Sequence, residues 1–347
     1  MPPRRSETTP SRSSHARRRL TLLTSVAALV LVGALLAGAP GHTQATSARQ
    51  PGRAARHARR AARHAGRAAR PSAGAQPPAA SPVAHAVPLL VSDPATRSAA
   101  WTPVALLRGQ AAAWIAQRAD VTLLRFNQRF LRVDLHAGSS DGGVSGWSYG
   151  DEITPSEIHH VVAAFNGGFK LSYANVGFEA GGHVAVPLRE GLASIVTYTD
   201  GTTDIGAWKE GVPAAGRTVY SVLQNQFLLV DGGNLAPNAS SCVITCWGGT
   251  VAGLSAVARS GLGITAGGQL IWAAGEQLLP AELGQALIAA GAVRAIELDI
   301  NPDWVDGYLY VHHAGGPAAL PVLPGQLGIA GRLLEPYSRD FLALVAN

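Results

Sequence analysis

The sequence predicts an α+β domain over residues 96–347. It consists of a mixed, largely antiparallel β-sheet with a few flanking helices, and a disordered tail precedes it. Three observations support this fold class. Short runs rich in β-branched and aromatic residues recur between glycine-rich turns from residue 121 onward. Only two stretches have the pattern of a helix. The composition also changes near residue 90, from Arg, Ala and Pro to that of an ordinary globular chain.

The first element is an export leader over residues 1–40. Three arginines, Arg17 to Arg19, precede an uncharged run at residues 20–39 that is rich in Leu, Val and Ala. This run ends in Ala37-Gly38-Ala39, small residues of the kind that a signal peptidase requires. A run of this length could also just span a bilayer. We therefore expect either a cleaved signal peptide or a retained membrane anchor.

The second element is a tether over residues 41–95. Between residues 49 and 89 it holds eight arginines and no acidic residue, and it has almost no large apolar side chain. Such a segment cannot bury enough apolar surface to offset its ordering entropy, so we expect it to be disordered. Beyond a solvated linker, this basic segment could bind anionic envelope polymers or lipid headgroups.

The net positive charge of the chain comes from the residues before position 90. The whole sequence has a formal charge of +6, but residues 90–347 contain 14 basic and 21 acidic side chains, a formal charge of −7. An acidic domain is not expected to bind nucleic acid specifically. Leader, tether and charge together predict an extracytoplasmic protein that is secreted or anchored facing outward.

Within the domain, helices are expected at residues 103–118 and 280–290, the second ended by Gly291. Strands are expected at residues 121–126, 130–136, 161–165, 193–198, 219–222, 227–230 and 293–300. Hairpin turns are indicated by Asp200-Gly201, Asp231-Gly232-Gly233 and Gly267-Gly268. Cys242 and Cys246 are the only cysteines. In an oxidising compartment we expect a disulfide between them, with two free thiols as the alternative.

Two glycine-containing segments carry candidate binding residues. The strand ending at Asn166 runs into Gly167 and Gly168, which let the backbone approach a ligand closely, and then into Lys170, a cation. The alternative is a structural turn with a solvated lysine. In the second segment Arg259 precedes a glycine-rich strand, where a guanidinium could bind a phosphate. The alternative for this arginine is a surface ion pair.

A third segment carries candidate catalytic residues. Side chains alternate along a strand, so Glu297 and Asp299 share one face, with Cα atoms roughly 6.5–7 Å apart. Two carboxylates on an apolar strand are costly unless a cation compensates them. Their proximity would raise one pKa, which suits acid–base chemistry. Asn301 and Asp303 follow where the strand ends and are candidate substrate contacts. A structural ion-pair network is the alternative.

These segments, in this order, make the chain from about residue 161 onward resemble the phosphodiester glycosidase family. The resemblance is in the Asn-Gly-Gly-Phe motif that starts at Asn166, in Arg-x-x-x-Gly from Arg259, in a hairpin at residues 225–232, and in a strand leading to Leu298-Asp299. This family includes an enzyme that removes N-acetylglucosamine from a phosphodiester, and it also includes many bacterial envelope and exopolysaccharide-associated proteins. This chain has Ile300 and Asn301 where the family has glycines, and Lys170 where many members have a second Phe.

The resemblance implies hydrolysis of sugar–phosphate diester linkages in envelope or extracellular glycopolymers. Arg259 and Lys170 would contact the phosphate, Glu297 and Asp299 would lie near the anomeric centre, and Asn166 would hold sugar hydroxyls. The alternative function is a catalytically inactive module that binds envelope glycopolymers. The sequence identifies no cofactor, although a divalent cation is a possible one.

Overall fold

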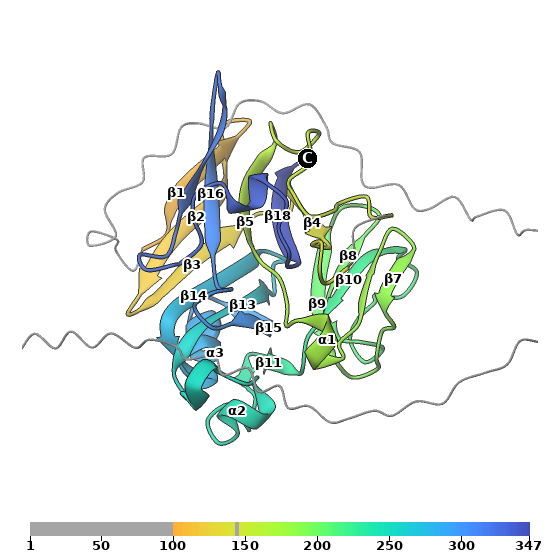
Figure 1. The fold of residues 1–347 in the computed structure, drawn as a ribbon, viewed down its shortest axis with the longest axis vertical. Coiled ribbons are helices and arrows are strands. Elements are labelled where there is room, and N and C mark those ends of the chain that lie inside the picture. The colour runs from red at the N-terminus through yellow and green to blue at the C-terminus, as the bar shows by residue number, and fades with distance from the viewer. Residues whose placement is uncertain (1–99, 143–145) are drawn as a thin grey trace, which may run out of the picture. The chain divides into compact units, whose positions relative to one another are not determined.

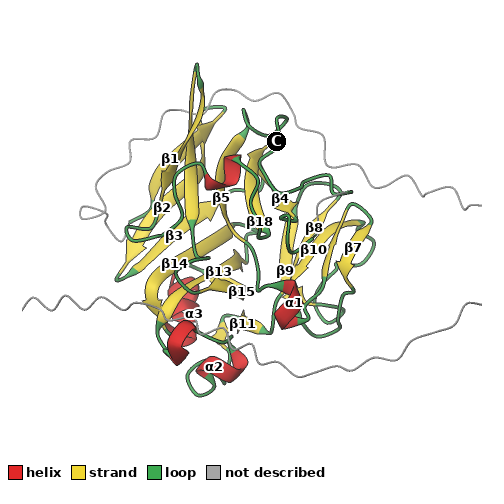
Figure 2. Ribbon diagram, in the orientation of Figure 1, coloured by secondary structure: helices red, strands yellow, loops and turns green. Residues whose placement is uncertain are grey.

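The computed structural model describes residues 100–142 and 146–347. Strands dominate this part of the chain, and the helices are few and short (Figure 2). Every strand pairing within its three sheets is antiparallel. The predominance of antiparallel strands is therefore confirmed, while the mixed sheet is wrong. The predicted leader, and the tether up to residue 95, lie outside the described residues. Among the described helices, none has the length and apolarity needed to cross a membrane.

The largest sheet has eight strands, and its central strands are buried on both faces. In spatial order they are β1 (Thr102–Leu107), β2 (Gln110–Arg118), β3 (Val121–Phe126), β14 (Leu270–Leu278), β13 (Val257–Thr265), β15 (Ala292–Ile300), β11 (Leu228–Asp231) and β12 (Asn234–Leu235). Alternation along β14 illustrates the two faces: Leu270 and Trp272 belong to the main core, whereas Ile271 and Ala273 pack in the cluster with helix α3 (Pro280–Ala289).

Two five-stranded sheets complete the domain (Figure 1). One has the order β7 (His183–Val186), β6 (Phe178–Ala180), β10 (Val219–Gln224), β8 (Ala193–Tyr198), β9 (Thr203–Ala207). The other has the order β17 (Gly316–Pro321), β16 (Gly307–His313), β5 (Val161–Asn166), β18 (Phe341–Ala346), β4 (Leu131–His136). The remaining elements are single turns: α1 (Leu171–Ala174), α2 (Val243–Cys246), and the 3-10 helices η3 (Val251–Gly253) and η4 (Arg332–Leu334).

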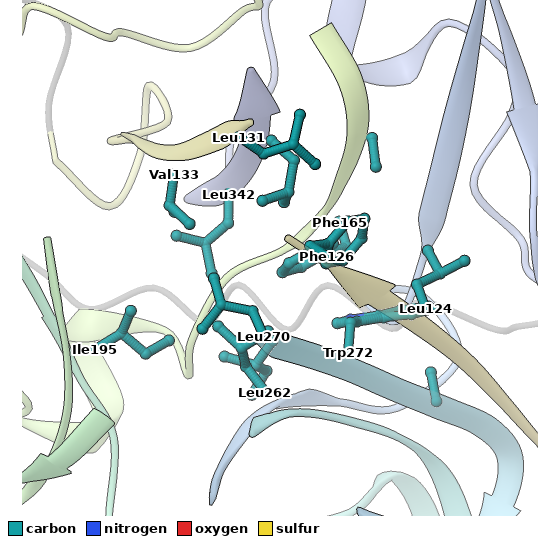
Figure 3. Packing of buried hydrophobic residues seen from close by; sticks show 14 of the residues in the cluster. Leu124, Phe126, Leu131, Val133, Phe165, Ile195, Leu262, Leu270, Trp272 and Leu342 are labelled. Carbon is teal, nitrogen blue, oxygen red and sulfur yellow. The ribbon is translucent and has the colours of Figure 1, made fainter. Parts of the chain in front are cut away.

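The main core joins the three sheets (Figure 3). Phe165 of β5 lies with its ring centroid 6.0 Å from that of Phe126 and 5.5 Å from that of Trp272, so aromatic side chains connect two of the sheets. All three rings are fully buried. Because β5 and β15 contribute to this core on their inner faces, the ends of these two strands are held in fixed positions. The candidate site lies at these ends.

The helix predicted at residues 103–118 is wrong. Strands β1 and β2 form a hairpin there, connected by Arg108 and Gly109 with φ angles of 52° and 75°. Two successive positive φ angles are typical of a tight hairpin turn. The helix was predicted from the spacing of the apolar residues on either side of Arg108 and Gly109, which did not reveal the turn between them. Helix α3, the strand predictions and the three predicted hairpin turns agree with the structure.

Candidate functional site

The candidate site is a cavity of about 450 Å³ at the ends of strands β5 and β15. Residues of several separate segments line it, and both apolar and charged side chains contribute. They are Phe169, Lys170, Tyr173, Ala174, Gln226, Gly248, Gly249, Asp299, Ile300, Asn301, Trp304 and Arg339. Of the residues predicted from sequence, the cavity is therefore lined by Asp299, Lys170 and Asn301.

Backbone hydrogen bonds hold the walls of this cavity together. The Asp299 amide donates to the Gly167 carbonyl at 2.8 Å, and the Gly167 amide donates to the Asp340 carbonyl at 3.0 Å. A Cβ atom at Gly167 would lie 2.1 Å from the Asp340 carboxylate, so only glycine fits. The close approach that the sequence predicted here is made to Asp340, a residue of the domain itself.

Asp299 is the carboxylate that reaches the cavity. Its Oδ1 accepts a hydrogen bond from the Ile300 amide at 2.8 Å, and its Oδ2 lies 2.9 Å from Arg339 Nη2. Burial disfavours the ionised form and raises the pKa of Asp299 to about 7, although the Arg339 charge opposes this shift. An aspartate with a pKa in this range can hold or release a proton near neutral pH.

Arg339 is a site residue that the sequence analysis missed. Its guanidinium contacts three aspartates: Asp141 with Nε–Oδ2 at 2.7 Å, Asp299 at 2.9 Å, and Asp340 with Nη2–Oδ1 at 3.7 Å. Nη2 also donates to the Gly168 carbonyl at 2.9 Å. The only signal in the sequence was the Arg-Asp pair directly before the apolar run of β18, and nothing local connects that pair with Asp299.

Asp340 is fully buried behind the cavity. Its Oδ2 accepts a hydrogen bond from the Gly168 amide at 2.8 Å. Burial raises the pKa of Asp340 to about 8, opposed by Arg339, with the neighbouring charges of Asp141 and Asp299 adding to the increase. The cluster of three acids around one arginine therefore retains a proton at neutral pH, and this lowers its net negative charge.

Arg259 and Glu297 form a buried ion pair that does not line the cavity. Arg259 Nη1 lies 2.7 Å from Glu297 Oε1, and the guanidinium also donates to the carbonyls of Leu278 at 2.9 Å and Trp247 at 3.1 Å. Arg259 is 0% exposed. Burial raises the pKa of Glu297, and Arg259 opposes that shift. In this arrangement Arg259 cannot reach a phosphate in the cavity, contrary to the role expected from the sequence. The alternative prediction for Arg259, an ion pair on the surface, is also wrong, because Arg259 and Glu297 are both buried.

The pairing of β15 with β13 shifts register between Glu297 and Ile300, so the regular alternation from which the sequence predicted a shared face for Glu297 and Asp299 is interrupted there. Their partners differ. Glu297 is paired with Arg259 and Asp299 with Arg339. The Glu297 charge raises the pKa of Asp299, as the smallest of its causes. Of the two carboxylates, only Asp299 lines the cavity.

Of the remaining residues predicted from the sequence, one lines the cavity and two do not. Asn166 is buried, and its Nδ2 donates a hydrogen bond to Ser260 Oγ at 2.9 Å. The backbone carbonyl of Asp303 accepts a hydrogen bond from Arg332 Nη1 at 3.3 Å. Neither lines the cavity. Asn301 does, with a φ of 76° in the left-handed region that favours glycine. Asparagine tolerates this region better than most residues.

A disulfide closes the loop that supplies the opposite wall. Cys242, which directly precedes helix α2, is bonded to Cys246, the last residue of that helix, with Cα atoms 5.3 Å apart. The next residue, Trp247, is fully buried, and Gly248 then lines the cavity. A Cβ atom at Gly248 would lie 2.7 Å from Phe169 Cζ, so this loop packs closely against the cavity wall. In the described residues, no group of three or more His, Cys, Asp or Glu side chains is placed to bind a metal ion.

Comparisons with known proteins found similar solved structures. No family model matches the chain. No curated protein matches it either. The zebrafish N-acetylglucosamine-1-phosphodiester alpha-N-acetylglucosaminidase catalytic domain, auto-inhibited by its pro-peptide, is 14% identical; the match covers 67% of this chain and 78% of that chain, with a TM-score of 0.43. A hypothetical protein from Synechocystis is 14% identical; the match covers 69% of this chain and 63% of that chain, with a TM-score of 0.37. A putative exported protein from Burkholderia pseudomallei is 12% identical over 68% and 75%, with a TM-score of 0.30.

Proposed function

We propose that the protein hydrolyses glycosyl phosphodiester linkages, with Asp299 as the catalytic carboxylate. The observation that carries this proposal is the position of Asp299: it is the one aspartate or glutamate among the described cavity-lining residues, and Arg339 holds it at 2.9 Å. Glycoside cleavage needs a carboxylate at the anomeric carbon, where positive charge develops in the transition state. The motif resemblance to phosphodiester glycosidases selects the same aspartate.

The other side chains of the cavity suit the rest of such a substrate. Lys170 is exposed at the cavity wall and can bind a phosphate oxygen. Trp304 offers an aromatic side chain to a sugar ring, and the amides of Gln226 and Asn301 offer hydrogen bonds to hydroxyl groups. Of the two cations expected to contact the phosphate, only Lys170 keeps this role in the proposal, because Arg259 is enclosed by its own partners.

The proposed reaction breaks the bond between the anomeric carbon and the phosphate oxygen. The bonding electron pair leaves with the phosphate, which is a good leaving group and needs little proton donation. Lys170 stabilises the charge that develops on the departing phosphate. Water attacks the anomeric carbon and transfers a proton to Asp299, which then releases it to solvent. The products are the free sugar and a phosphate monoester of the aglycone.

We also propose that this reaction takes place outside the cytoplasm, on cell-envelope or extracellular glycopolymers. The supporting features are the apolar leader and the basic tether of the sequence, both outside the described residues. The tether would hold the protein on anionic polymers or lipid headgroups, a contact that weakens as the screening length falls to about 3 Å at 1 M salt. Salt elution of the intact protein and of a variant without residues 49–70 from anionic polymer tests this role.

The test of the activity uses the full chain and a panel of sugar-1-phosphate diesters. Release of the free sugar by the wild type is expected, and Asp299→Asn should lower kcat by about 100-fold or more while substrate still binds. Asp303→Asn is the matched control, since Asp303 is a nearby aspartate that does not line the cavity. Near-wild-type turnover by Asp299→Asn would refute the assignment. Saturable glycan binding without turnover by the wild type would replace catalysis with the binding-module function.

A further inference from the structure

Four exposed apolar side chains belong to the segments that line the cavity, and they are called the apolar rim here. Tyr173 is 84% exposed, Phe227 49%, Val251 58% and Leu254 58%. Each belongs to a segment that also lines the cavity: Tyr173 is a lining residue itself, Phe227 follows the lining residue Gln226, and the other two follow Gly248 and Gly249. Helices α1 and α2 and strand β11, which carry or adjoin these segments, lie at one end of the domain in Figure 1.

Hydrogen bonding fixes the position of this apolar rim relative to the site. The Val251 amide donates to Asn301 Oδ1 at 2.9 Å, so Val251 is attached directly to a lining residue. Thr250 Oγ1 donates to the Leu254 carbonyl and keeps the two apolar side chains on one short loop. Exposed apolar residues that occur singly need no explanation, but a group around one cavity indicates a ligand with an apolar part.

A positive charge in the cavity wall adjoins the rim. The Lys170 Nζ atom is 5.2 Å from the centroid of the Tyr173 ring, so a cation adjoins the most exposed apolar side chain of the rim. Deeper in the cavity, Asp299 is paired with Arg339. From the inside outward, the order is therefore carboxylate, cation, apolar rim. A molecule matching this order has a sugar at one end, an anionic phosphate in the middle and an apolar chain at the other end.

We infer that the substrate of this site is an amphiphile: a sugar-1-phosphate esterified to an alkyl or prenyl chain, with the chain lying over Tyr173, Phe227, Val251 and Leu254. This inference rests on the proposed function and specifies its aglycone. The sugar enters the cavity toward Asp299, the phosphate contacts Lys170, and the chain remains on the rim, which buries only part of it. Hydrolysis then releases the sugar and leaves the phosphate on the chain.

The length of the aglycone chain should therefore govern the Michaelis constant. Full burial of one methylene corresponds to roughly a fourfold gain in affinity, and half-burial to about twofold. Two substrates that share one sugar and differ only in an ethyl or a decyl aglycone are compared below the micelle concentration of the decyl compound. For the wild type we expect KM of the decyl substrate to be lower by on the order of 100-fold.

Variants of the rim locate the effect. The double variant Val251→Ser with Leu254→Ser should reduce the KM ratio between ethyl and decyl substrates to below about tenfold, since less apolar surface remains for the chain. The matched control is Val184→Ser, a valine of strand β7 that is 54% exposed and does not line the cavity. Its ratio should equal that of the wild type. Calorimetry with ethyl phosphate and decyl phosphate gives a second readout that does not depend on turnover.

The outcomes separate this inference from the proposed function. If both substrates are hydrolysed with equal KM, the apolar aglycone is wrong and the hydrolase proposal stands. If Val184→Ser lowers the KM ratio between ethyl and decyl substrates as much as the rim variant does, the proposal that the chain binds at the rim is overturned. If neither substrate is hydrolysed but decyl phosphate binds more tightly than ethyl phosphate in a rim-dependent manner, the hydrolase proposal fails and the surface for an apolar chain is supported. Equal binding of the two phosphates overturns the inference.

Discussion

Asp299 and Arg339 are 40 residues apart in the sequence, yet Asp299 Oδ2 and Arg339 Nη2 lie 2.9 Å apart at the wall of the cavity. The same guanidinium holds Asp141 at 2.7 Å and donates to the Gly168 carbonyl at 2.9 Å. Arg339 therefore fixes the direction of the Asp299 carboxylate and partly offsets the rise in its pKa caused by burial.

Arg339→Lys should lower turnover by about tenfold or more, because one ammonium group cannot reproduce the several directed contacts of a guanidinium. Loss of its close contact to Asp299 should also shift the pH profile of kcat/KM toward higher pH, an effect that a purely structural role would not produce. Arg217→Lys is the control: Arg217 pairs with Asp200 on the surface, and its replacement should leave both readouts unchanged. An unshifted profile in Arg339→Lys would show that Arg339 does not position Asp299.

The pH dependence of kcat/KM should follow the ionisation of Asp299. The pKa of this group is raised to about 7, and the proposed reaction needs the ionised carboxylate to accept a proton from water. We therefore expect kcat/KM for a sugar phosphodiester to rise between pH 5 and 8 with a midpoint near 7. The residual activity of Asp299→Asn should not show this rise. A decrease over the same range would make Asp299 the proton donor.

Asp340→Asn should reduce the pH dependence of folding stability. The pKa of Asp340 is about 8 in the folded protein and about 3.9 in an unfolded chain. Between these values the folded state retains a proton that the unfolded state has lost, so the contribution of Asp340 falls as the pH rises. Thermal unfolding from pH 5 to 8.5 should show a smaller loss of stability in the variant than in the wild type. If the stability of the variant and of the wild type falls equally steeply with pH, Asp340 is ionised throughout this range.

Gly167→Ala should destabilise the domain by about 1–3 kcal/mol or more, because the added methyl group would lie 2.1 Å from the Asp340 carboxylate. Gly150→Ala is the matched control, since a Cβ at Gly150 has no neighbour within 4 Å. Chemical denaturation measures both variants. If Gly167→Ala unfolds at the wild-type denaturant concentration, the close contact between this turn and Asp340 does not exist.

The pair of Arg259 and Glu297 should matter for stability and little for turnover. Arg259→Met leaves a buried carboxylate without its partner and should cost about 3–5 kcal/mol. The double variant Arg259→Met with Glu297→Leu should recover much of this loss, since both buried charges are removed. Turnover per folded molecule should remain near the wild-type value because neither residue lines the cavity. A loss of about 100-fold in the folded double variant would restore the catalytic role that the sequence suggested.

Local patterns were sufficient to predict the ranges of seven of the eighteen described strands and of helix α3, because strand alternation and turn residues operate over a few neighbouring positions. They were misleading at residues 103–118, where apolar residues on both sides of Arg108 and Gly109 imitated a helix. The same limit applies to the site. Asp299 and Lys170 could be found from short motifs, whereas the partner of Asp299 could not. Arg339 reaches the cavity only through the pairing of β18 with β5, a contact between distant segments.

Strand β18 has a consequence for when the site can form. It lies between β5 and β4 in its sheet, and Arg339 and Asp340 directly precede it. The other strands described here are all synthesised before it, so the gap between β5 and β4 remains open until residues 339–346 are available. Until then Asp299 has no arginine beside it and the Gly167 turn has no Asp340 against which to pack. A partly synthesised chain therefore cannot carry out the proposed hydrolysis, and the order of synthesis itself delays activity until the domain has closed.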